Sequence, residues 1–264
     1  MSVHEIAAAG FDKEATTYAQ SRPSYPTDAV DWITAHLRLA PGIRCVDLAA
    51  GTGIFTRLIN ASGCDLVAIE PVEGMRTELR SSLPAMPTLS AIAESLPLRN
   101  MSIDAVTIAQ AFHWFDADAA LAELRRVLKV GGRVALLWNA RDRSRDWVDQ
   151  VWGVMDRVEK HAPWRNHDQV ATDDSQATRE SELNGAEGFG PTHTAQFHHE
   201  QIVTPQQVVL RVKGVSHVAV LPAREQQIVL DEVRSIVTTH PDTAGRSQLA
   251  IPYRVDCYWL ERTV

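Results

Sequence analysis

Cysteine is scarce in this sequence, which has three (Cys45, Cys64 and Cys257) among 264 residues. None of them belongs to a C-x-x-C pair, and an odd number does not suggest a framework of disulfides. Reduced thiols are typical of cytoplasmic proteins, so we expect three buried free cysteines and a cytoplasmic location. The first residues, MSVHEIAAAGFDKEA, lack a basic start followed by an apolar core, which argues against a secretory signal.

The sequence also lacks an excess of positive charge and a long apolar run. Its net charge is -7, and it has no basic stripe that would attract phosphates, so we expect no nucleic-acid partner. No segment reaches the roughly 20 apolar residues that span a bilayer, so we expect no membrane partner. His198 and His199 have no further ligands at metal-binding spacing, and we therefore expect no metal site. The oligomeric state stays open, with a homodimer as one option.

What the sequence does have is a regular alternation of apolar stretches and amphipathic stretches. The apolar stretches predict strands at residues 43–48, 65–69, 88–91, 103–109 and 133–138, with helices at 54–60, 72–83 and from 116 to the Gly131-Gly132 pair. Continuous apolar strands favour a parallel sheet covered by helices on both faces. Later strands at 194–202 and 249–260 predict an antiparallel addition. We therefore predict an α/β fold with a Rossmann-like, doubly wound, mostly parallel seven-stranded sheet and an antiparallel C-terminal strand.

The two ends of the chain differ from this central part. Residues 1–40 predict a helical segment that is interrupted by the prolines of SRPSYP, because proline removes a backbone donor. Residues 41–264 would form the Rossmann-like domain, with helices near 144–160, 205–212 and 222–239. The polar stretch 162–191 is rich in glycine and proline near its end, and we expect a long loop inserted there.

The sequence DLAAGTG, which follows the first predicted strand, predicts a ligand-binding turn. Gly51 and Gly53 permit backbone angles that a side chain would disfavour, and they let a ligand approach the main chain. In an open parallel sheet, ligands bind beyond the carboxyl ends of the strands. Glu70 ends the next strand, where its carboxylate can accept hydrogen bonds from both hydroxyls of a ribose. The turn and Glu70 together suggest a cofactor that contains adenosine.

Two residues argue against a nicotinamide dinucleotide as that cofactor. The fingerprint G-x-G-x-x-G requires a glycine where this sequence has Thr56. Asp47, just before the turn, would oppose a diphosphate but would attract an ammonium group. S-adenosylmethionine carries an ammonium group, a sulfonium and no phosphate, and it therefore fits the turn better.

Five stretches in order resemble successive motifs of class I S-adenosylmethionine-dependent methyltransferases: DLAAGTG, AIEP, AIAESLPL, DAVTIAQAFHWF and LKVGGRVALLW. They are similar in particular to the small-molecule branch that contains trans-aconitate methyltransferase-like proteins (methyltransferase type 11). The resemblance covers residues 11–138 well and the remainder loosely.

The resemblance implies a cofactor site and a lid. The methionine part of the cofactor would bind at Asp47, Ala49, Gly51 and Gly53, the ribose at Glu70, and the adenine at Pro71, Met75, Ile92, Ala93 and Glu94, with Gln110 beneath the sulfonium. Residues 1–40 would fold over the cofactor as a helical lid that brings Tyr18 and Arg22 to it.

Two positions depart from the family pattern. Ala49 stands where glycine is usual, so the turn must lie slightly farther from the cofactor or adopt ordinary backbone angles. Ile92 stands where an aspartate often accepts a bond from the adenine amine, so backbone atoms replace that contact or it is absent.

Methyl transfer is an in-line attack, and alignment of donor and acceptor supplies much of its rate. A general base is needed only where the acceptor holds its proton tightly. His113 titrates near neutrality and could serve as that catalytic base, or it could pack against Trp114 to shape the loop. Aromatic and polar residues near the predicted mouth are the candidates for contact with the substrate: Tyr25, His113, Trp114, Trp138, His217 and Tyr253. Tyr258 is a candidate for core packing.

We therefore predict an S-adenosylmethionine-dependent methyltransferase that acts on a small organic molecule, with oxygen, nitrogen or carbon as the acceptor atom. One alternative is an enzyme of the same fold that uses the cofactor for a rearrangement or cyclisation without methyl transfer. Another is a non-catalytic protein that binds the cofactor.

Overall fold

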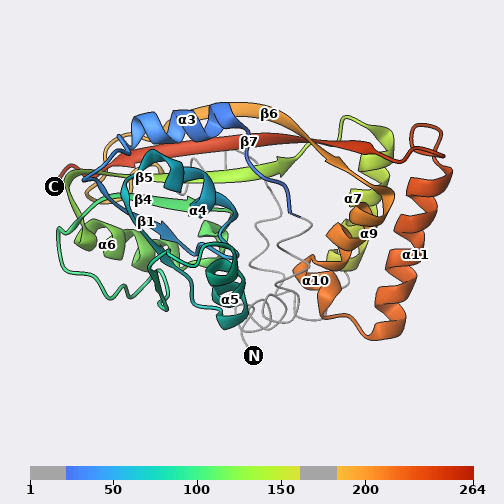
Figure 1. Ribbon diagram of the computed structural model, residues 1–264, viewed down its shortest axis with the longest axis horizontal. Coiled ribbons are helices and arrows are strands. Elements are labelled where there is room, and N and C mark those ends of the chain that lie inside the picture. The colour runs from blue at the N-terminus through green and yellow to red at the C-terminus, as the bar shows by residue number, and fades with distance from the viewer. Residues whose placement is uncertain (1–21, 161–182) are drawn as a thin grey trace. The chain divides into compact units, whose positions relative to one another are not determined.

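The computed structural model describes residues 22–160 and 183–264 (Figure 1). The strands are β1 Arg44–Leu48, β2 Asp65–Ile69, β3 Thr88–Leu89, β4 Ile103–Ala109, β5 Leu128–Arg141, β6 His193–Val203 and β7 Leu249–Glu261. The helices are α3 Thr27–His36, α4 Ile54–Ile59, α5 Glu73–Ser82, α6 Ala117–Val127, α7 Asp146–Lys160, α9 Pro205–Lys213, α10 Ser216–Ala219 and α11 Ala223–Thr239.

The strands form one seven-stranded sheet in the order β3-β2-β1-β4-β5-β7-β6. Strands β1 to β5 pair in parallel, and β7 is the antiparallel strand, inserted between β5 and β6. The predicted Rossmann-like, mostly parallel sheet is therefore confirmed. The antiparallel strand is not at the edge of the sheet, because β6 lies outside it.

Most of the predicted elements are present within one or two residues of their expected bounds, but the helix expected to end at Gly131 is shorter. Helix α6 begins as predicted, since the Asp116 side chain accepts a hydrogen bond from the Ala119 amide at 3.1 Å. It ends at Val127, because Leu128 already pairs with Ile103 of β4. Strand β5 thus begins before the two glycines.

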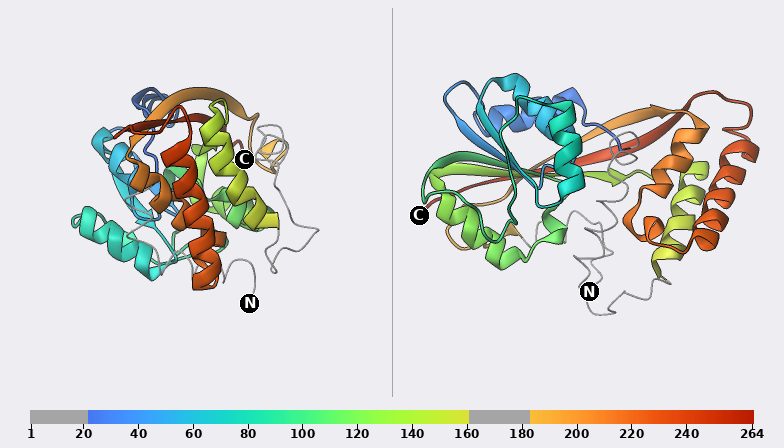
Figure 2. Two further views of the ribbon diagram at one scale, coloured as in Figure 1. Left: turned by 90° about the vertical axis from the view of Figure 1, so that its right-hand side faces the viewer. Right: turned by 60° about the horizontal axis from the view of Figure 1, so that its bottom comes forward.

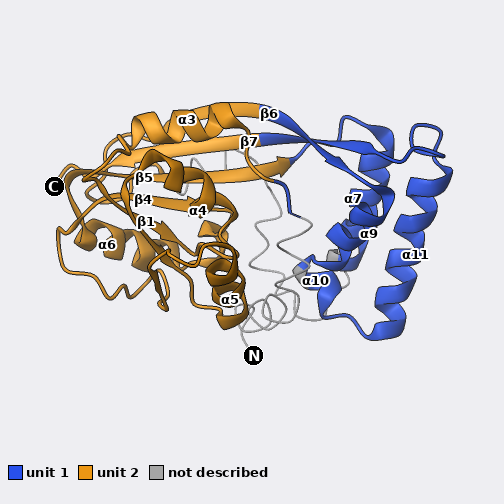
Figure 3. Ribbon diagram, viewed as in Figure 1, with its two compact units in different colours: residues 1–23, 141–172, 198–254 blue, residues 24–140, 173–197, 255–264 orange. Residues whose placement is uncertain are grey.

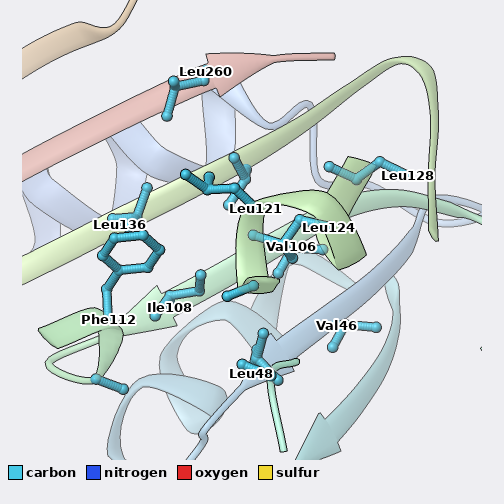
Figure 4. Packing of buried hydrophobic residues seen from close by; sticks show 14 of the residues in the cluster. Val46, Leu48, Val106, Ile108, Phe112, Leu121, Leu124, Leu128, Leu136 and Leu260 are labelled. Atoms are coloured by element: carbon cyan, nitrogen blue, oxygen red, sulfur yellow. The ribbon is translucent and has the colours of Figure 1, made fainter. Parts of the chain in front are cut away.

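Helices cover both faces of the parallel part of the sheet, and Figure 2 shows α3 and α6 on opposite sides of it. On one face, Val106 of β4 and Leu136 of β5 pack against Leu121 and Leu124 of α6, as Figure 4 shows. On the other face, buried residues of α3 and α4 form a second cluster with small residues of the strands, among them Ala105. The alternation of side chains along each strand produces these two layers.

The chain divides into two compact units, which Figure 3 distinguishes by colour. Unit 1 comprises residues 1–23, 141–172 and 198–254, and unit 2 comprises residues 24–140, 173–197 and 255–264. This division differs from the expected boundary at residue 40, because α3 belongs to unit 2. Its residues Ala29 and Ile33 are buried in the same cluster as Cys45 of β1.

A third apolar cluster forms the core of unit 1. It contains Trp152 of α7, Val212 of α9, Val233 of α11 and Tyr253 of β7. The three cysteines are free and buried, as predicted. Among the helices within 22–160 and 183–264, none combines the length and the apolar character that crossing a bilayer requires.

Candidate cofactor and substrate site

The site lies where the strand order of the sheet reverses. Strands β1 and β4 are neighbours, and the chain continues outward from them in opposite directions, to β2 and β3 on one side and to β5 on the other. The loops that follow β1 and β4 therefore begin at the same edge of the sheet. This switch point is the place where open α/β sheets bind their ligands.

The backbone is strained at the start of both loops. Ala49, after β1, has φ 53°, and Gln110, after β4, has φ 61°. Left-handed angles cost a residue with a Cβ atom about 1 kcal/mol, and such costs are typical of functional sites. The turn after β1 thus does not adopt the ordinary angles that we considered for Ala49.

Glycine is favoured at the two positions of the turn for different structural reasons. Both have positive φ, 57° at Gly51 and 81° at Gly53. A Cβ atom at Gly53 would also lie 3.1 Å from Cγ of Leu79 in α5, whereas one at Gly51 would meet no atom within 4 Å. Gly53 therefore permits close packing of α5, and Gly51 borders open space that a ligand could occupy.

Asp47 is buried and held by two hydroxyl groups. Thr56 Oγ1 donates to Asp47 Oδ2 at 2.6 Å, and Thr107 Oγ1 donates to Asp47 Oδ1 at 2.7 Å. Burial raises the pKa of Asp47 to about 6, although the two hydroxyl groups oppose the shift. Asp47 thus joins β1 to α4 and β4, and it places a titratable carboxyl group beneath the turn.

Glu70 connects the ends of β1 and β2. Its Oε2 accepts a hydrogen bond from the Gly51 amide at 2.9 Å, and its Oε1 accepts one from the Val72 amide at 2.9 Å. Burial raises the pKa of Glu70, and the two amides and Arg76 oppose that shift. A carboxylate can accept more than one hydrogen bond at each oxygen, so Glu70 can bind hydroxyl groups while it holds the turn.

The residues expected around an adenine differ in exposure. Met75 and Ala93 are buried, and Pro71 is exposed. Ile92, in the loop between β3 and β4, is 53% exposed. Glu94 Oε1 accepts a hydrogen bond from the Asp116 amide at 2.9 Å, so Glu94 helps to begin α6.

His113 and Trp138, two of the expected substrate residues, are in contact. Trp138 Nε1 donates to His113 Nδ1 at 3.4 Å, and the His113 ring also packs on Trp114, with 4.8 Å between the ring centroids. A neutral imidazole that accepts at Nδ1 carries its proton on Nε2. This arrangement favours a role for His113 in orienting Trp138, since Nε2 is then a donor rather than a base.

The other expected substrate residues are divided between the two units. Tyr25 is buried in unit 2 against Phe55, and its ring centroid lies 5.1 Å from that of Phe55. His217 of α10 and Tyr253 of β7 belong to unit 1, as does Arg22, whose guanidinium donates to the Gly214 carbonyl at 3.5 Å. Tyr18 lies outside the described residues. Tyr258 is buried in the core of unit 2, as predicted.

Sequence reasoning missed several hydrogen-bond partners of Asp47 and Glu70. Thr56 was noted only as the absence of a glycine, yet its hydroxyl binds Asp47. A buried acid at position 47 needs a donor, and this need was the signal available in the sequence. Thr107 and Arg76 carried no such signal, because each reaches its partner through the tertiary fold. Arg76 Nη1 donates to the Glu70 carbonyl at 2.7 Å.

Comparisons with known proteins agree with this geometry. The profile of a methyltransferase domain matches residues 46–136, which include the turn, Glu70 and both strained loops. A protein of Mycobacterium tuberculosis called an uncharacterized methyltransferase is 34% identical over 247 residues, or 94% of this chain and 93% of the relative. A methyltransferase-like protein of Schizosaccharomyces pombe is 29% identical over 253 residues, or 96% and 95% of the two chains.

The fold has solved counterparts as well. The crystal structure of the YcgJ protein from Bacillus subtilis superposes with a TM-score of 0.58 at 14% identity, covering 90% of this chain and all of that one. The chain therefore belongs to the class I methyltransferase family.

Proposed function

We propose that the protein is an S-adenosylmethionine-dependent methyltransferase that acts on a small organic molecule. The observation that carries this proposal is the pair of buried carboxyl groups, Asp47 and Glu70, at a glycine turn on the switch point of the sheet. None of the residues 47–56 is basic. Negative charge under such a turn suits an ammonium group and ribose hydroxyls, and it opposes the phosphates of a dinucleotide.

The chain's own residues would divide the binding between them. Glu70 would accept hydrogen bonds from the ribose hydroxyls, and the field of Asp47 would attract the ammonium group through the turn. The exposed side chain of Ile92 would cover one face of the adenine, since an exposed apolar side chain gains free energy when a planar base covers it. Gln110, held in a left-handed conformation, would border the sulfonium.

Bound in this way, S-adenosylmethionine supplies a methyl group on a positive sulfonium. The protein's contribution is to align the acceptor with that methyl group and to exclude water. Trp138, oriented by His113, would form part of the wall against which the acceptor packs. We assign His113 a positioning role on this geometry, and its role as a general base stays a prediction.

Weaker relatives support the reaction class. A malonyl-[acyl-carrier protein] O-methyltransferase of Methylococcus capsulatus is 34% identical over 158 residues, or 56% of this chain and 52% of the relative. A demethylmenaquinone methyltransferase of Corynebacterium urealyticum is 40% identical over 102 residues. These two act on different acceptors, so they favour the reaction class without selecting the acceptor atom.

Binding of S-adenosylhomocysteine, measured by calorimetry, tests the cofactor assignment. We expect Glu70→Gln to weaken this binding by at least about tenfold, because it removes charge-assisted bonds to the ribose. Asp65→Asn is the matched control, since Asp65 is an exposed acid at the other end of β2, and we expect it to leave the affinity unchanged.

Two results would contradict the assignment. A wild-type protein that binds NADH but not S-adenosylhomocysteine would exclude the cofactor, and a folded Glu70→Gln variant with full affinity would exclude the ribose contact. Transfer itself is tested by product mass. An acceptor that gains one methylene unit while S-adenosylhomocysteine forms is a methylation product, and an isomerised or cyclised product would instead favour use of the cofactor without transfer.

A further inference from the structure

Helix α5 carries a buried guanidinium group next to the end of β2. Arg76 is 7% exposed, whereas the side chain of Arg80, one turn later on the same helix, is 50% exposed. Burial of a guanidinium group is costly unless charged or polar partners surround it. The partners of Arg76 therefore indicate what its burial serves.

One partner of Arg76 is the main chain of Glu70. Arg76 Nη1 donates to the Glu70 carbonyl at 2.7 Å, and this contact is buried. The carbonyl lies just beyond β2, which ends at Ile69. The Arg76 amide also donates to the Val72 carbonyl at 3.0 Å. Arg76 thus holds the chain on both sides of Pro71, where β2 continues into α5.

The charge of Arg76 acts on the Glu70 side chain as well. Glu70 is 5% exposed, and burial raises the pKa of its carboxyl group. The amides of Val72 and Gly51 and the charge of Arg76 oppose this shift, whereas the charge of Asp47 adds to it. Arg76 is the cation in this set, so its removal would favour the protonated form of Glu70.

The ion-pair partner of Arg76 on its own helix is exposed. Arg76 Nη2 pairs with Glu73, whose Oε1 also lies 3.5 Å from Nη1 of Arg80. The Glu73 side chain is 64% exposed, so water screens its charge. Arg80 engages the same carboxylate from a half-exposed position. Pairing with Glu73 therefore does not require a buried guanidinium group, and the contact with Glu70 does.

We propose that Arg76 is a positioning residue for the cofactor, which holds Glu70 in place and in its charged form for the ribose. This inference rests on the proposed function, in which Glu70 accepts hydrogen bonds from the ribose hydroxyls. A protonated Glu70 would lose the charge that strengthens those bonds, and one of its oxygens would carry a proton. Arg76 acts here through Glu70, and it extends cofactor binding to lower pH.

The pH dependence of S-adenosylhomocysteine binding tests this role, measured by calorimetry on the full chain. Arg76→Met should lose affinity at a higher pH than the wild type does. We expect the ratio of wild-type to variant affinity to be at least about threefold larger at about pH 6 than at about pH 8. Arg76→Lys keeps the charge, and its profile should return towards that of the wild type.

Two further variants serve as controls. Arg80→Met removes the other arginine that engages Glu73, and it should leave the affinity and its pH dependence unchanged. Arg76→Met made in the Glu70→Gln protein should cause no change in pH dependence, because the titrating group is then absent. Asp47 titrates in the same range, but Arg76 is not among the causes of its shift, so the comparison with the wild type isolates Glu70.

A loss of affinity in Arg76→Met that is equal at every pH would overturn the proposal, since a purely structural role has that effect. The same shift of the profile in the Glu70→Gln protein would overturn it too, because Arg76 would then act through another group. Should Arg76→Met not fold, Arg76→Gln replaces it, since an amide can donate to a carbonyl without a charge. A wild-type protein that binds no S-adenosylhomocysteine contradicts both proposals, and wild-type binding with unshifted profiles in the Arg76 variants contradicts this one alone.

Discussion

At the scale of single residues, Asp47 shows that a buried acid can have hydrogen-bond partners for both oxygens and still lower the stability of the folded protein at neutral pH. Its carboxyl group is satisfied by two threonine hydroxyls, yet burial still favours the neutral form. Thr56 and Thr107 lie on α4 and β4, so the acid connects three elements around the turn. An ionised Asp47 attracts a positive ligand, and the folded protein bears the desolvation cost of that charge.

This cost predicts a pH dependence of stability. The pKa of Asp47 rises from 3.8 to about 6 on folding, so the folded protein binds this proton more tightly than the unfolded chain. The resulting stabilisation is fully present below the unfolded pKa, and it is lost as pH rises through about 6. About two pKa units correspond to about 3 kcal/mol of unfolding free energy.

Asp47→Asn should remove this contribution, because an amide keeps the shape and stays neutral. We expect the wild type to lose stability relative to the variant between about pH 4 and about pH 7, as measured by urea unfolding at a series of pH values. The pKa of Glu70 is also raised, mainly by burial, and taking the difference between the two proteins removes all of its contribution except the smallest part, which comes from the charge of Asp47. If the free energy of unfolding depended on pH in the same way in both proteins, the pKa of Asp47 would be the same in the folded and unfolded states.

At the scale of elements, α6 shows how the start of a helix can be connected to a preceding loop. The Asp116 side chain accepts from the Ala119 amide, while its own amide donates to Glu94. Glu94 belongs to the loop that we expect to line the adenine. The same cap therefore ends that loop and begins the helix that covers one face of the sheet.

Asp116→Ala should destabilise the protein by about 1 kcal/mol, because the first turn of α6 loses its side-chain acceptor. Asp118→Ala is the control, since Asp118 is exposed in the same turn without capping it, and its loss should cost only a few tenths of a kcal/mol. Chemical denaturation of both variants measures the difference. Equal losses for the two would mean that charge near the helix start matters and the cap does not.

At the scale of the whole molecule, strand β7 contributes to the cores of both units. Its residues Ile251 and Tyr253 are buried in the cluster of unit 1, and Val255 and Cys257 are buried in a cluster of unit 2. One continuous strand thus carries side chains of two separate cores. We infer that a substitution that destabilises one core lowers the free energy of unfolding of the whole chain.

Val233→Ala tests this inference, because Val233 is fully buried in α11 of unit 1. It should cost about 2 kcal/mol through lost burial and a cavity. Ile228→Ala is the control, since Ile228 is 61% exposed on the same helix and should change little. Unfolding followed by tryptophan fluorescence and by far-ultraviolet circular dichroism should stay coincident in Val233→Ala, and two separated transitions would show that the units unfold independently.

The sequence alone determined the order of the elements, the parallel sheet and the position of the glycine turn after β1. These features are local, because the alternation of apolar residues, the glycines of the turn and the acid at the end of β2 each lie within a short stretch. The match of five motifs in order then pointed to the family. The length of β5 was missed, because its first residue is selected by pairing with β4 rather than by propensity.

Only the tertiary structure decided which groups meet. Thr107 reaches Asp47 across 60 positions of sequence, and the Asp116 amide reaches Glu94 across 22. Burial and pairing depend on contacts between distant residues, so periodicity and spacing could not report them. For the same reason the sequence could predict an acid, Glu70, at the end of a strand. Only the fold shows that its two oxygens accept hydrogen bonds from the amides of Gly51 and Val72.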